Sequence, residues 1–546
     1  MDVIAVVRGG AWVLFALLAT ACRDQSGGGG GDDSTTAGQA GSAGDASDTS
    51  GGGTASADAS ATADGGSADS GGSSDTGEGP GPGGPTWPIG IPRPEFGVDE
   101  LAGAVTLVVD DANPLPDPIP AGAVIEIQGS YGVGHTSPNG ITCAGTADAP
   151  AFIRGAPDSF ITGGWEVSGS YCILEQLSFG PAGDAVGGIV LLAPADHIAL
   201  RDSDIAGNGV DAGGTGVVSW QPGMVAHDVV LLRNTIHDGG DVEADFDQDV
   251  HGIAIGADVH HVWVVGNEMA RNSGDGIQIN AGPGNHASLH HIYVGLNVSH
   301  DNKQTGFWVK QAQDVIFSQN AAFGHRPSNS SFGACMGFQY GPERVWMIFN
   351  YLFDCEVGIG LASNADDGSD GVDSYIVGNV ISNIHDLDGS FDEASAWRDA
   401  GMMLIGGVDR RVVHNTIHDV VSGIRTTGAP GSSLLVSGNI VSASEGNHLF
   451  NEGDVGAMTV RNNLTDVALR QVNAACEACV TGEPGFTDPA AQDFTVGPDS
   501  AARDIALEEE VYGEFESRYG ESIRVTPLGD ARPLGDAWDA GAFEAG

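Results

Sequence analysis

The sequence predicts an all-β chain that folds as a right-handed parallel β-helix, and two repeating strand patterns support this prediction. The first is an apolar run that ends in a polar residue, usually Asn, as in VLLRNTI, VWVVGNEM and LVSGNIV. The second is a strand that begins with Gly, as in HGIAIG, DGIQIN and TGFWVK. Neither unit can bury its apolar face alone, but stacked units share a continuous core. The right hand follows from the general rule for connections between parallel strands.

The Asn residues of the first pattern recur 23 to 36 residues apart. In a stack they are expected to form a ladder, because each side-chain amide can bond to the backbone and to the amide one turn away. The expected ladder residues are Asn234, Asn267, Asn297, Asn320, Asn350, Asn379, Asn415, Asn439 and Asn462. The two patterns together predict two strands per turn. A β-sandwich fits less well, because its strands would recur about every 8–12 residues.

The chain divides into segments of different composition. Residues 1–22 combine one Arg, an apolar run too short to span a membrane, and the ending LLATAC, which resembles a bacterial lipoprotein signal with Cys22 as the lipidated residue. Residues 23–85 are almost wholly Gly, Ser, Ala, Asp and Thr, as in a disordered tether. Residues 86–546 are the predicted β-helix domain: 86–170 lead into the helix and cap it, 171–465 form regular coils, and 466–546 close it.

These segments predict an exported monomer that is anchored in the outer membrane through a lipid on Cys22, or is otherwise secreted. Export permits disulfides, and the six cysteines beyond Cys22 are expected to pair with their sequence neighbours, although the sequence leaves other pairings open. The expected pairs are Cys143–Cys172, Cys335–Cys355 and Cys476–Cys479. Helical periodicity is nearly absent, apart from one short helix expected around residues 506–520.

The formal charge of −52 excludes some partners. Nucleic acids and anionic lipid headgroups need clustered cations, which a strongly acidic surface does not offer. The same charge repels an acidic polysaccharide unless bound cations or a local basic position reverse it. Lysine occurs only at Lys303 and Lys310, both in the stretch DNKQTGFWVKQ, and these two residues are the candidates for such a position.

Stacking converts the Gly-led strands into columns of outward side chains. If Gly252, Gly276, Gly306 and Gly337 align, one outward column is Ala254, Gln278, Trp308 and Gln339, and the next is Gly256, Asn280, Lys310 and Gly341. Because neighbouring rungs lie about 4.8 Å apart, Lys310 and Trp308 would lie close to Asp275 and the amides. This set is typical of a glycan-binding groove, with Trp308, Gln278, Asn280 and Gln339 as the substrate-binding residues. An ordinary solvated lysine at a strand edge is the alternative.

The loop DVEADFDQDVHG, residues 241–252, leads into the same column. Its alternating aspartates, together with Asp275, suit a hard cation such as Ca²⁺. The candidate metal ligands are Asp245, Asp247, Asp249 and Asp275. The loop lacks the Gly and the terminal Glu of an EF-hand, so a solvated acidic loop is the alternative.

The Asn-marked repeat, the opening WPIGIPRPEFGVDE and the terminal DAWDAGAFEAG resemble the secreted parallel β-helix repeat proteins of the pectate-lyase-like superfamily. Within it, RNSGDGIQIN followed by HDNKQTGFWVKQ resembles the family 9 polysaccharide lyases, in which aspartates bind calcium and a lysine acts as the base. Asp275 matches the second Asp of the family's pair. Gly274 stands in place of the first Asp, Gln278 in place of a third, and Trp308 in place of the lysine. Lys310 lies on the same face, about 6.6 Å further along the strand.

The resemblance implies a polysaccharide-active protein that is most simply a lyase, cleaving a uronate-containing polysaccharide by β-elimination. Lys310 is the first candidate for the catalytic base, Lys303 the second, and His251 a reserve because imidazole titrates in the useful range. Calcium would neutralise the sugar carboxylate. Two alternatives stay open. One is a non-catalytic surface protein that binds an acidic or neutral polysaccharide, and the other is a glycoside hydrolase that uses Asp249 and Asp275 as paired carboxylates.

Overall fold

The computed structural model describes residues 87–132, 139–180, 188–219, 223–244, 246–282, 284–328, 330–362, 371–385, 400–427, 431–453, 455–472 and 475–545. The predicted signal peptide, residues 1–22, and the predicted tether, residues 23–85, lie outside the described residues. No helix in the described part of the chain has the length and apolar character needed to cross a membrane.

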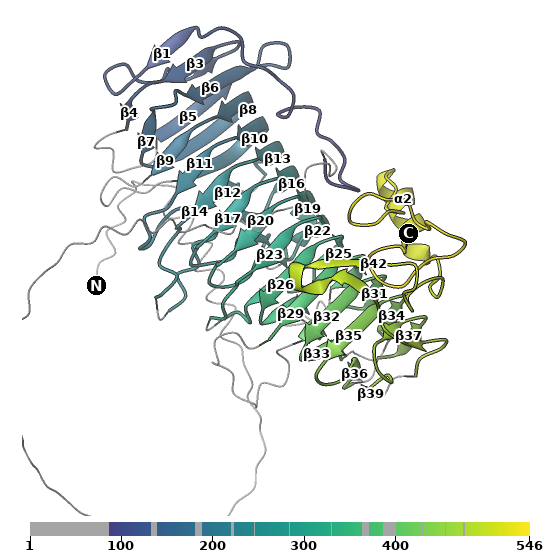
Figure 1. The fold of residues 1–546 in the computed structure, drawn as a ribbon. Coiled ribbons are helices and arrows are strands. Elements are labelled where there is room, and N and C mark those ends of the chain that lie inside the picture. The colour runs from purple at the N-terminus through teal and green to yellow at the C-terminus, as the bar shows by residue number, and fades with distance from the viewer. Residues whose placement is uncertain are drawn as a thin grey trace, which may run out of the picture. The chain divides into compact units, whose positions relative to one another are not determined.

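The described chain is a stack of coils built from parallel strands, which confirms the predicted parallel β-helix (Figure 1). Most coils contain three strands, as in β12 (Thr215–Val218), β13 (Ala226–Leu232) and β14 (Thr235–His237), after which β15 (Ile253–Ile255) begins the next coil. The expectation of two strands per turn is therefore wrong. Each predicted Asn-bearing strand is bent at its Asn into two strands, because Asn234 forms the corner between β13 and β14.

Strands in equivalent positions form three columns. The first column is β2 (Ile119–Pro120), β5 (Asn139–Ala144), the first part of β8 (Trp165–Glu175) and of β10 (Ile189–Arg201), β12, β15, β18 (Ile277–Asn280), β21 (Phe307–Lys310), β24 (Ala334–Gln339), β27 (Val357–Leu361), β30 (Ala400–Leu404), β33 (Ser422–Thr426), β36 (Leu449–Asn451) and β39 (Gln471–Val472).

The second column is β1 (Leu107–Val109), β3 (Val124–Ile127), β6 (Ala151–Gly155), the second part of β8 and of β10, β13, β16 (Val259–Val265), β19 (Leu289–Gly295), β22 (Gln313–Ser318), β25 (Glu343–Ile348), β28 (Val372–Val377), β31 (Asp409–Val413), β34 (Ser433–Ser437) and β37 (Ala457–Arg461).

The third column is β4 (Ser130–Tyr131), β7 (Phe160–Thr162), β9 (Ser178–Gly180), β11 (Asp204–Ala206), β14, β17 (Glu268–Ala270), β20 (Val298–His300), β23 (Ala321–Phe323), β26 (Tyr351–Cys355), β29 (Val380–Ile384), β32 (Thr416–Val420), β35 (Ile440–Ser444), β38 (Leu464–Thr465) and β40 (Val480–Thr481). Outside the columns lie η1 (His286–Ser288), η2 (Pro489–Ala491), the antiparallel pair β41 (Phe486–Asp488) and β42 (Asp493–Val496), and the helix α2 (Glu510–Tyr519).

The interior of the stack is a continuous apolar core. One inward row of the first column consists of Ile253, Ile277, Phe307 and Met336, all fully buried. Burial of each such side chain contributes about 1.5–3 kcal/mol. The predicted register was wrong by two residues at the last of these strands: Gly337 pairs with Trp308 instead of Gly306, and Met336 pairs with Phe307. Met336 and Phe338 both face the core, so Gly337 faces outward under the Trp308 ring.

The Asn ladder is present from Asn234 to Asn439 as predicted. Each side-chain oxygen accepts from the backbone N–H and the amide Nδ2 of the preceding Asn at 2.8–3.1 Å. The last rung is Asn463, whose Oδ1 accepts from Asn439, and not the predicted Asn462. Asn462 adopts φ 53° and donates its amide to the carbonyl of Ile505 in the C-terminal segment.

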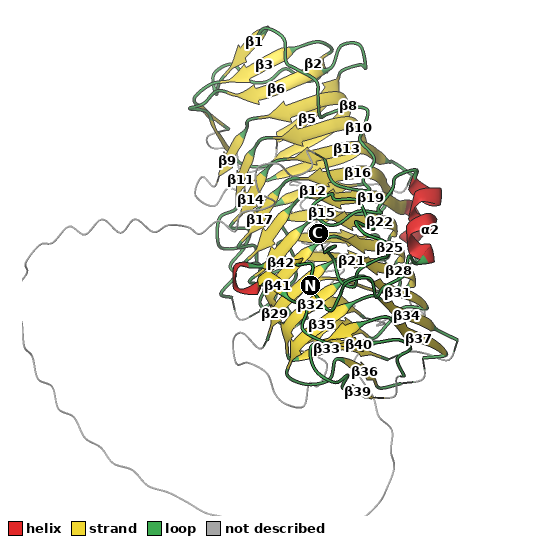
Figure 2. Cartoon of the chain, turned by 45° about the vertical axis from the view of Figure 1, so that its right-hand side comes forward, coloured by secondary structure: helices red, strands yellow, loops and turns green. Residues whose placement is uncertain are grey.

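The outer surface of the second column carries a row of apolar side chains that the two ends of the described chain cover. On the N-terminal side, the Trp263 indole N–H donates to the Pro92 carbonyl at 2.7 Å. On the C-terminal side, Trp346 stacks on Tyr375 and meets Phe515 edge-on, with ring centres 4.8 Å apart. Phe515 belongs to α2, which lies on the outside of the stack (Figure 2). The short helix expected around residues 506–520 is therefore confirmed, and it packs on the outside of the stack. These contacts form a second core outside the coils.

The expected disulfides are all present. Cys143 pairs with Cys172, Cys335 with Cys355, and Cys476 with Cys479. The first joins strands of neighbouring coils, and the second joins the first and third columns around β24 and β26.

Candidate functional site

A cleft of about 590 Å³, which includes open solvent, lies on the outer side of the first column. Its lining residues are Asp249, Asp275, Gln304, Thr305, Trp308, Lys310, Ser330, Ser331, Phe332, Gln339, Tyr340 and Ala362. Five residues predicted for the site, namely Asp249, Asp275, Trp308, Lys310 and Gln339, are therefore brought together in one cleft. His251, Lys303, Gln278, Asn280 and Asp247 are not among its lining residues.

Three neighbouring strands position the basic end of the cleft. Lys310 is the last residue of β21, and it pairs with Asn280 of β18 on one side and with Gln339 of β24 on the other. The Lys310 side chain is half-buried, and its Nζ lies 6.0 Å from the centre of the Tyr340 ring. The predicted neighbourhood of Lys310 and Asn280 is thus observed. Gln339 was predicted opposite Trp308, and the register of β24 moves it by two positions to lie opposite Lys310.

Asp275 is a buried carboxylate held by donors from its own coil and the next. Its Oδ1 accepts from the Thr305 backbone N–H at 3.1 Å and from the Thr305 hydroxyl. Its Oδ2 accepts from Nε2 of Gln278 at 2.8 Å. Gln278, which was predicted to contact substrate, is 3% exposed, and its amide orients Asp275. Asn280 donates from Nδ2 to Oε1 of Gln278 at 3.4 Å, so the two predicted amides belong to one network.

His251 lies beneath Asp275 and is buried. Its Nδ1 accepts the backbone N–H of Asp275 at 2.9 Å and lies 3.5 Å from Oδ2 of the same residue. An Nδ1 that accepts this bond carries no proton, so the proton of the neutral ring is on Nε2. Because His251 does not line the cleft, the structure supports a positioning role for it rather than the reserve role of base.

Lys303 ties down the acidic loop that precedes the site. Its Nζ donates to the carbonyls of Ala244 and Phe246, the latter at 2.8 Å, and the side chain is buried. Arg326 also contacts this loop, through an ion pair in which its Nη1 lies 2.7 Å from Oε1 of Glu243. The second candidate for the base is therefore engaged in holding a loop, and Lys310 is the lysine that faces the cleft.

The predicted metal ligands occupy different environments. Asp249, at the end of the loop, is buried and accepts from Nε2 of Gln304. Asp247 is half-buried, and its Oδ1 has no hydrogen-bond partner among the described residues. Asp245 lies outside the described residues. Among the described residues, one group of His, Cys, Asp and Glu side chains has ligand atoms that all lie within 4.8 Å of one another. Asp247, Asp249 and Asp275 do not belong to this group.

Trp308 forms a wall of the cleft and not the exposed stacking platform that was predicted. It is 6% exposed and packs with Ala334 and Met403. Its ring lies over glycines of the next two coils, where an added Cβ would approach ring carbons to 2.6 Å at Gly337 and 3.6 Å at Gly360. Because these glycines have no side chains, the indole lies against the sheet instead of projecting from it.

The lack of space around Gly274 explains why this position, where the lyase motif has its first Asp, carries no side chain. A Cβ at this position would lie 2.5 Å from Nδ1 of His251, 2.9 Å from the carbonyl carbon of Val250 and 3.0 Å from that of Asp249. A contact below about 3.0 Å forces neighbours to move, and the backbone of the preceding coil cannot do so cheaply. The space of the family's first Asp is therefore occupied by His251 and the coil before it.

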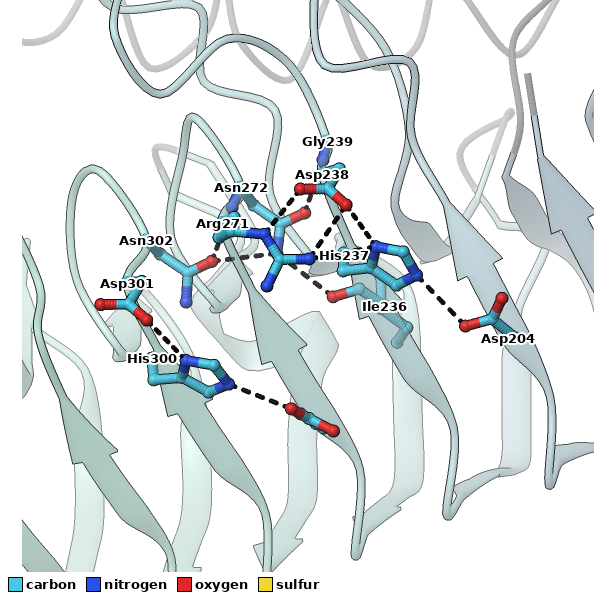
Figure 3. A network of polar contacts seen from close by, with 11 residues as sticks. Asp204, Ile236, His237, Asp238, Gly239, Arg271, Asn272, His300, Asp301 and Asn302 are labelled. Atoms are coloured by element: carbon cyan, nitrogen blue, oxygen red, sulfur yellow. Dashed lines mark hydrogen bonds and ion pairs between the residues drawn. The ribbon is translucent and has the colours of Figure 1, made fainter. Parts of the chain in front are cut away.

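A second, shorter Asn ladder holds the two coils that carry the site (Figure 3). The Asn302 Oδ1 accepts from both the backbone N–H and the Nδ2 of Asn272 at 2.9 Å, and the Asn272 Oδ1 accepts from Gly239 N–H at 3.0 Å. Asp275 and Thr305 each follow a ladder Asn by three residues. The ladder therefore fixes the spacing at which Thr305 reaches Asp275.

The sequence patterns missed part of the lining. Gln304 and Thr305 directly precede the Gly306 strand, and their place beside Asp249 and Asp275 could have been inferred from the column that holds Asp275. Tyr340 follows Gln339 just beyond the strand end. Ser330, Ser331 and Phe332 belong to a loop without periodicity, so only the folded chain places them at the cleft.

No protein-family model matches the chain, and no curated protein matches it. Similar solved structures include the pectate lyase Pel9A, at 10% identity and a TM-score of 0.40, with 81% of this chain and 97% of that chain covered. A mutant of the periplasmic alginate epimerase AlgG matches at 10% identity and a TM-score of 0.40, with 67% and 83% covered. A mannuronic acid specific family 6 polysaccharide lyase from human gut microbiota matches at 13% identity and a TM-score of 0.35, with 73% and 93% covered.

Proposed function

We propose that this protein binds a uronate-containing polysaccharide in the cleft of the first column and cleaves it by β-elimination, with Lys310 as the base. The observation that carries the proposal is the position of Lys310, a half-buried amine in a cleft that also holds Asp249, Asp275, Gln339 and Tyr340. The chain is otherwise strongly acidic. Lys310 is therefore the lining residue whose amine, in its neutral form, can accept a proton from the sugar.

The reaction requires three events at the sugar. The neutral amine of Lys310 removes the proton on the carbon next to the carboxylate, and the electron pair left on that carbon forms a double bond to its ring neighbour. The bond from that neighbour to the glycosidic oxygen breaks, and the departing oxygen takes a proton from a donor in the cleft or from water. Tyr340, beside Lys310, has a hydroxyl suited to this donation. Gln339 would bind the sugar hydroxyls.

Calcium belongs to the proposal as a ligand of the acidic side of the cleft. Asp249 and Asp275 would hold it, since Ca²⁺ takes oxygen ligands, and the buried Oδ1 of Asp247, which has no hydrogen-bond partner among the described residues, would extend the set. Asp245, in the same acidic loop, is a further candidate. Asp275 already accepts from Thr305 and Gln278, and the remaining lone pairs of its carboxylate would be the ones available to the ion. Bound calcium would neutralise the sugar carboxylate, which favours removal of the neighbouring proton.

A non-catalytic glycan-binding protein is the second candidate. It is favoured by the three donors on Asp275, which give this carboxylate a structural role without any metal. In a binding protein of this kind, the protonated Lys310 would form an ion pair with an acidic sugar and would remove no proton. An anchor on Cys22 would hold either form of the protein at the cell surface.

The test is a cleavage assay with the full chain on polymers of galacturonate, mannuronate, guluronate and glucuronate. Ultraviolet absorbance reports the unsaturated product, and a reducing-end assay runs in parallel. We expect unsaturated product that falls by about 10²–10⁴-fold in Lys310→Arg, because Arg keeps the charge but cannot act as a base. Removal of calcium with a chelator is expected to lower the rate, and added Ca²⁺ to restore it.

Gln339→Ala is the matched control, because it removes a lining side chain next to Lys310 without removing the base. It is expected to raise KM more than it lowers kcat. Full activity of Lys310→Arg would exclude this residue as the base. Binding without cleavage would establish the second candidate, and new reducing ends without unsaturation would indicate a hydrolase that uses Asp249 and Asp275.

A further inference from the structure

The strands β10, β13, β16 and β19 lie side by side on four neighbouring coils (Figure 1). A strip of histidines and aspartates crosses them where each strand enters the second column. The strip consists of the pairs Asp196–His197, His227–Asp228, His260–His261 and His290–His291. Their first members are in register, since Asp196 pairs with His227, His227 with His260, and His260 with His290. None of these residues lines the cleft described above.

The backbone brings both members of each pair to the same outer side. The second members, His197, Asp228, His261 and His291, have φ between 53° and 56°, the left-handed region. A residue in this conformation interrupts the alternation of a strand, as a β-bulge does. The contacts within the pairs follow from it: His227 Nδ1 lies 2.7 Å from Asp228 Oδ2, and His260 Nδ1 lies 2.8 Å from His261 Nδ1.

At one end of the strip the side chains form a ligand set. One ligand atom each from Asp196, His197, His227 and Asp228 lies within 4.8 Å of the other three. Asp196 lies between the imidazoles: its Oδ1 contacts Nδ1 of His197 and lies 3.5 Å from Nδ1 of His227. A tetrahedral site with bonds of 2.0–2.2 Å needs ligand atoms about 3.3 Å apart, which side-chain rotation can supply. The four side chains are 22–35% exposed, so an ion can reach them.

Aromatic neighbours hold the imidazoles in place. His197 stacks on Tyr171 at 4.4 Å, and Phe96 meets both rings edge-on. On the other side, His227 stacks on His260 with ring centres 5.2 Å apart and 12° between planes. The two imidazoles therefore have restricted orientations beside the two carboxylates, as in a preorganised metal-binding site and unlike a set of freely solvated side chains.

We propose that Asp196, His197, His227 and Asp228 bind one Zn²⁺ ion, which links the coil of β10 to the coil of β13. Zn²⁺ accepts imidazole nitrogen and carboxylate oxygen in a tetrahedral arrangement, whereas Ca²⁺ takes oxygen ligands only. Each imidazole would bind the ion through Nδ1, with its one ring proton on Nε2. The site is separate from the calcium of the proposed reaction and does not depend on it.

The test is calorimetric titration of the full chain with ZnCl₂ after removal of metals with a chelator. We expect one strong binding event per chain, in the presence of excess Ca²⁺, and a dissociation constant about tenfold or more higher in His227→Ala. Asp228→Asn, nearly identical in shape, is expected to weaken binding in the same direction and serves if His227→Ala does not fold. Substitution with Co²⁺ is expected to give the visible absorption of a tetrahedral ion.

Two variants serve as controls. His260→Ala removes the ring that stacks on His227 without removing a ligand, and it is expected to retain the strong site. His237→Ala removes a histidine that contacts Asp204 and Asp238 on the third column, where Arg271 already neutralises Asp238 (Figure 3). This variant is also expected to bind Zn²⁺ unchanged. Absence of Zn²⁺ binding in the unmodified chain, equal affinity in His227→Ala, or loss of the site in His260→Ala would each overturn the assignment.

Discussion

At the scale of single residues, the two lysines of the chain have different surroundings. Lys303 is buried and donates to two loop carbonyls, whereas Lys310 ends a strand and lines the cleft. The sequence ranked them in this order because alternation directs Lys310 outward from a strand that begins at Gly306. The hydrogen bonds of Lys303 could not be predicted, since they depend on a loop that is remote in sequence.

Lys303→Met is expected to lower the free energy of unfolding by about 1–3 kcal/mol, because two carbonyls lose a charged donor. Urea unfolding measures this loss. The pH dependence of kcat should keep its shape in this variant, since Lys310, the proposed base, is unchanged, even if KM rises through movement of the acidic loop. A shifted pH profile in Lys303→Met would instead assign the base to Lys303.

Gly274→Asp tests whether the missing first Asp of the lyase motif can be restored. The added side chain would overlap His251 and the backbone of the preceding coil, so we expect a loss of about 1–3 kcal/mol of stability and no gain in calcium affinity. Thermal unfolding with and without Ca²⁺ measures both quantities. A more stable variant with tighter calcium binding would show that the coil can open to accept the ligand.

At the scale of strands and corners, the Asn ladder determines the shape of each coil. Its position was predictable because Asn recurs at one place in an apolar pattern. The third strand was not, since β14 and its equivalents are only two to five residues long and follow the Asn without a break in the pattern. The register of β24 likewise depends on the packing of Met336 and Phe338, which a glycine alignment does not reveal.

Asn439→Ala is expected to destabilise the protein by about 1–3 kcal/mol, because buried donors of Asn415 lose their acceptor. Asn462→Ala is the matched control: Asn462 is half-buried and makes one hydrogen bond to Ile505, so a smaller loss is expected. Chemical denaturation of both variants gives the comparison. Equal losses would contradict the assignment of the last rung to Asn463.

At the scale of the whole molecule, buried and half-buried histidines set the pH at which the fold is most stable. For His300, burial opposes the charge, but hydrogen bonds to Asp301 and Glu268 outweigh it and raise the pKa to about 9. For His325, burial, assisted by the charge of nearby His300, lowers the pKa to about 4. These two residues lie on neighbouring coils and act in opposite directions.

Stability is expected to be greatest near pH 6.5. Above this pH the folded protein holds a proton on His300 that the unfolded chain has lost, so stability falls as the pH rises toward about 9. Below it the unfolded chain binds a proton that His325 resists, so stability falls toward pH 4. Thermal unfolding across this range measures the profile. His300→Gln should reduce the alkaline decline, and an unchanged decline would assign it to other groups.

The sequence by itself determined the repeating architecture and the strand on which Lys310 lies, whereas it only favoured the disulfide pairs that the folded chain shows. These features follow from local patterns, since alternation and corner residues act over a few positions and stacking repeats them. Tertiary structure decided what each outward side chain meets. It buried Trp308 over glycines of later coils, engaged Lys303 with a distant loop, placed His251 beneath Asp275, and aligned the histidine strip. Such contacts join residues on different coils, and the physical reason they escape the sequence is that their register and loop packing are fixed only when the coils stack.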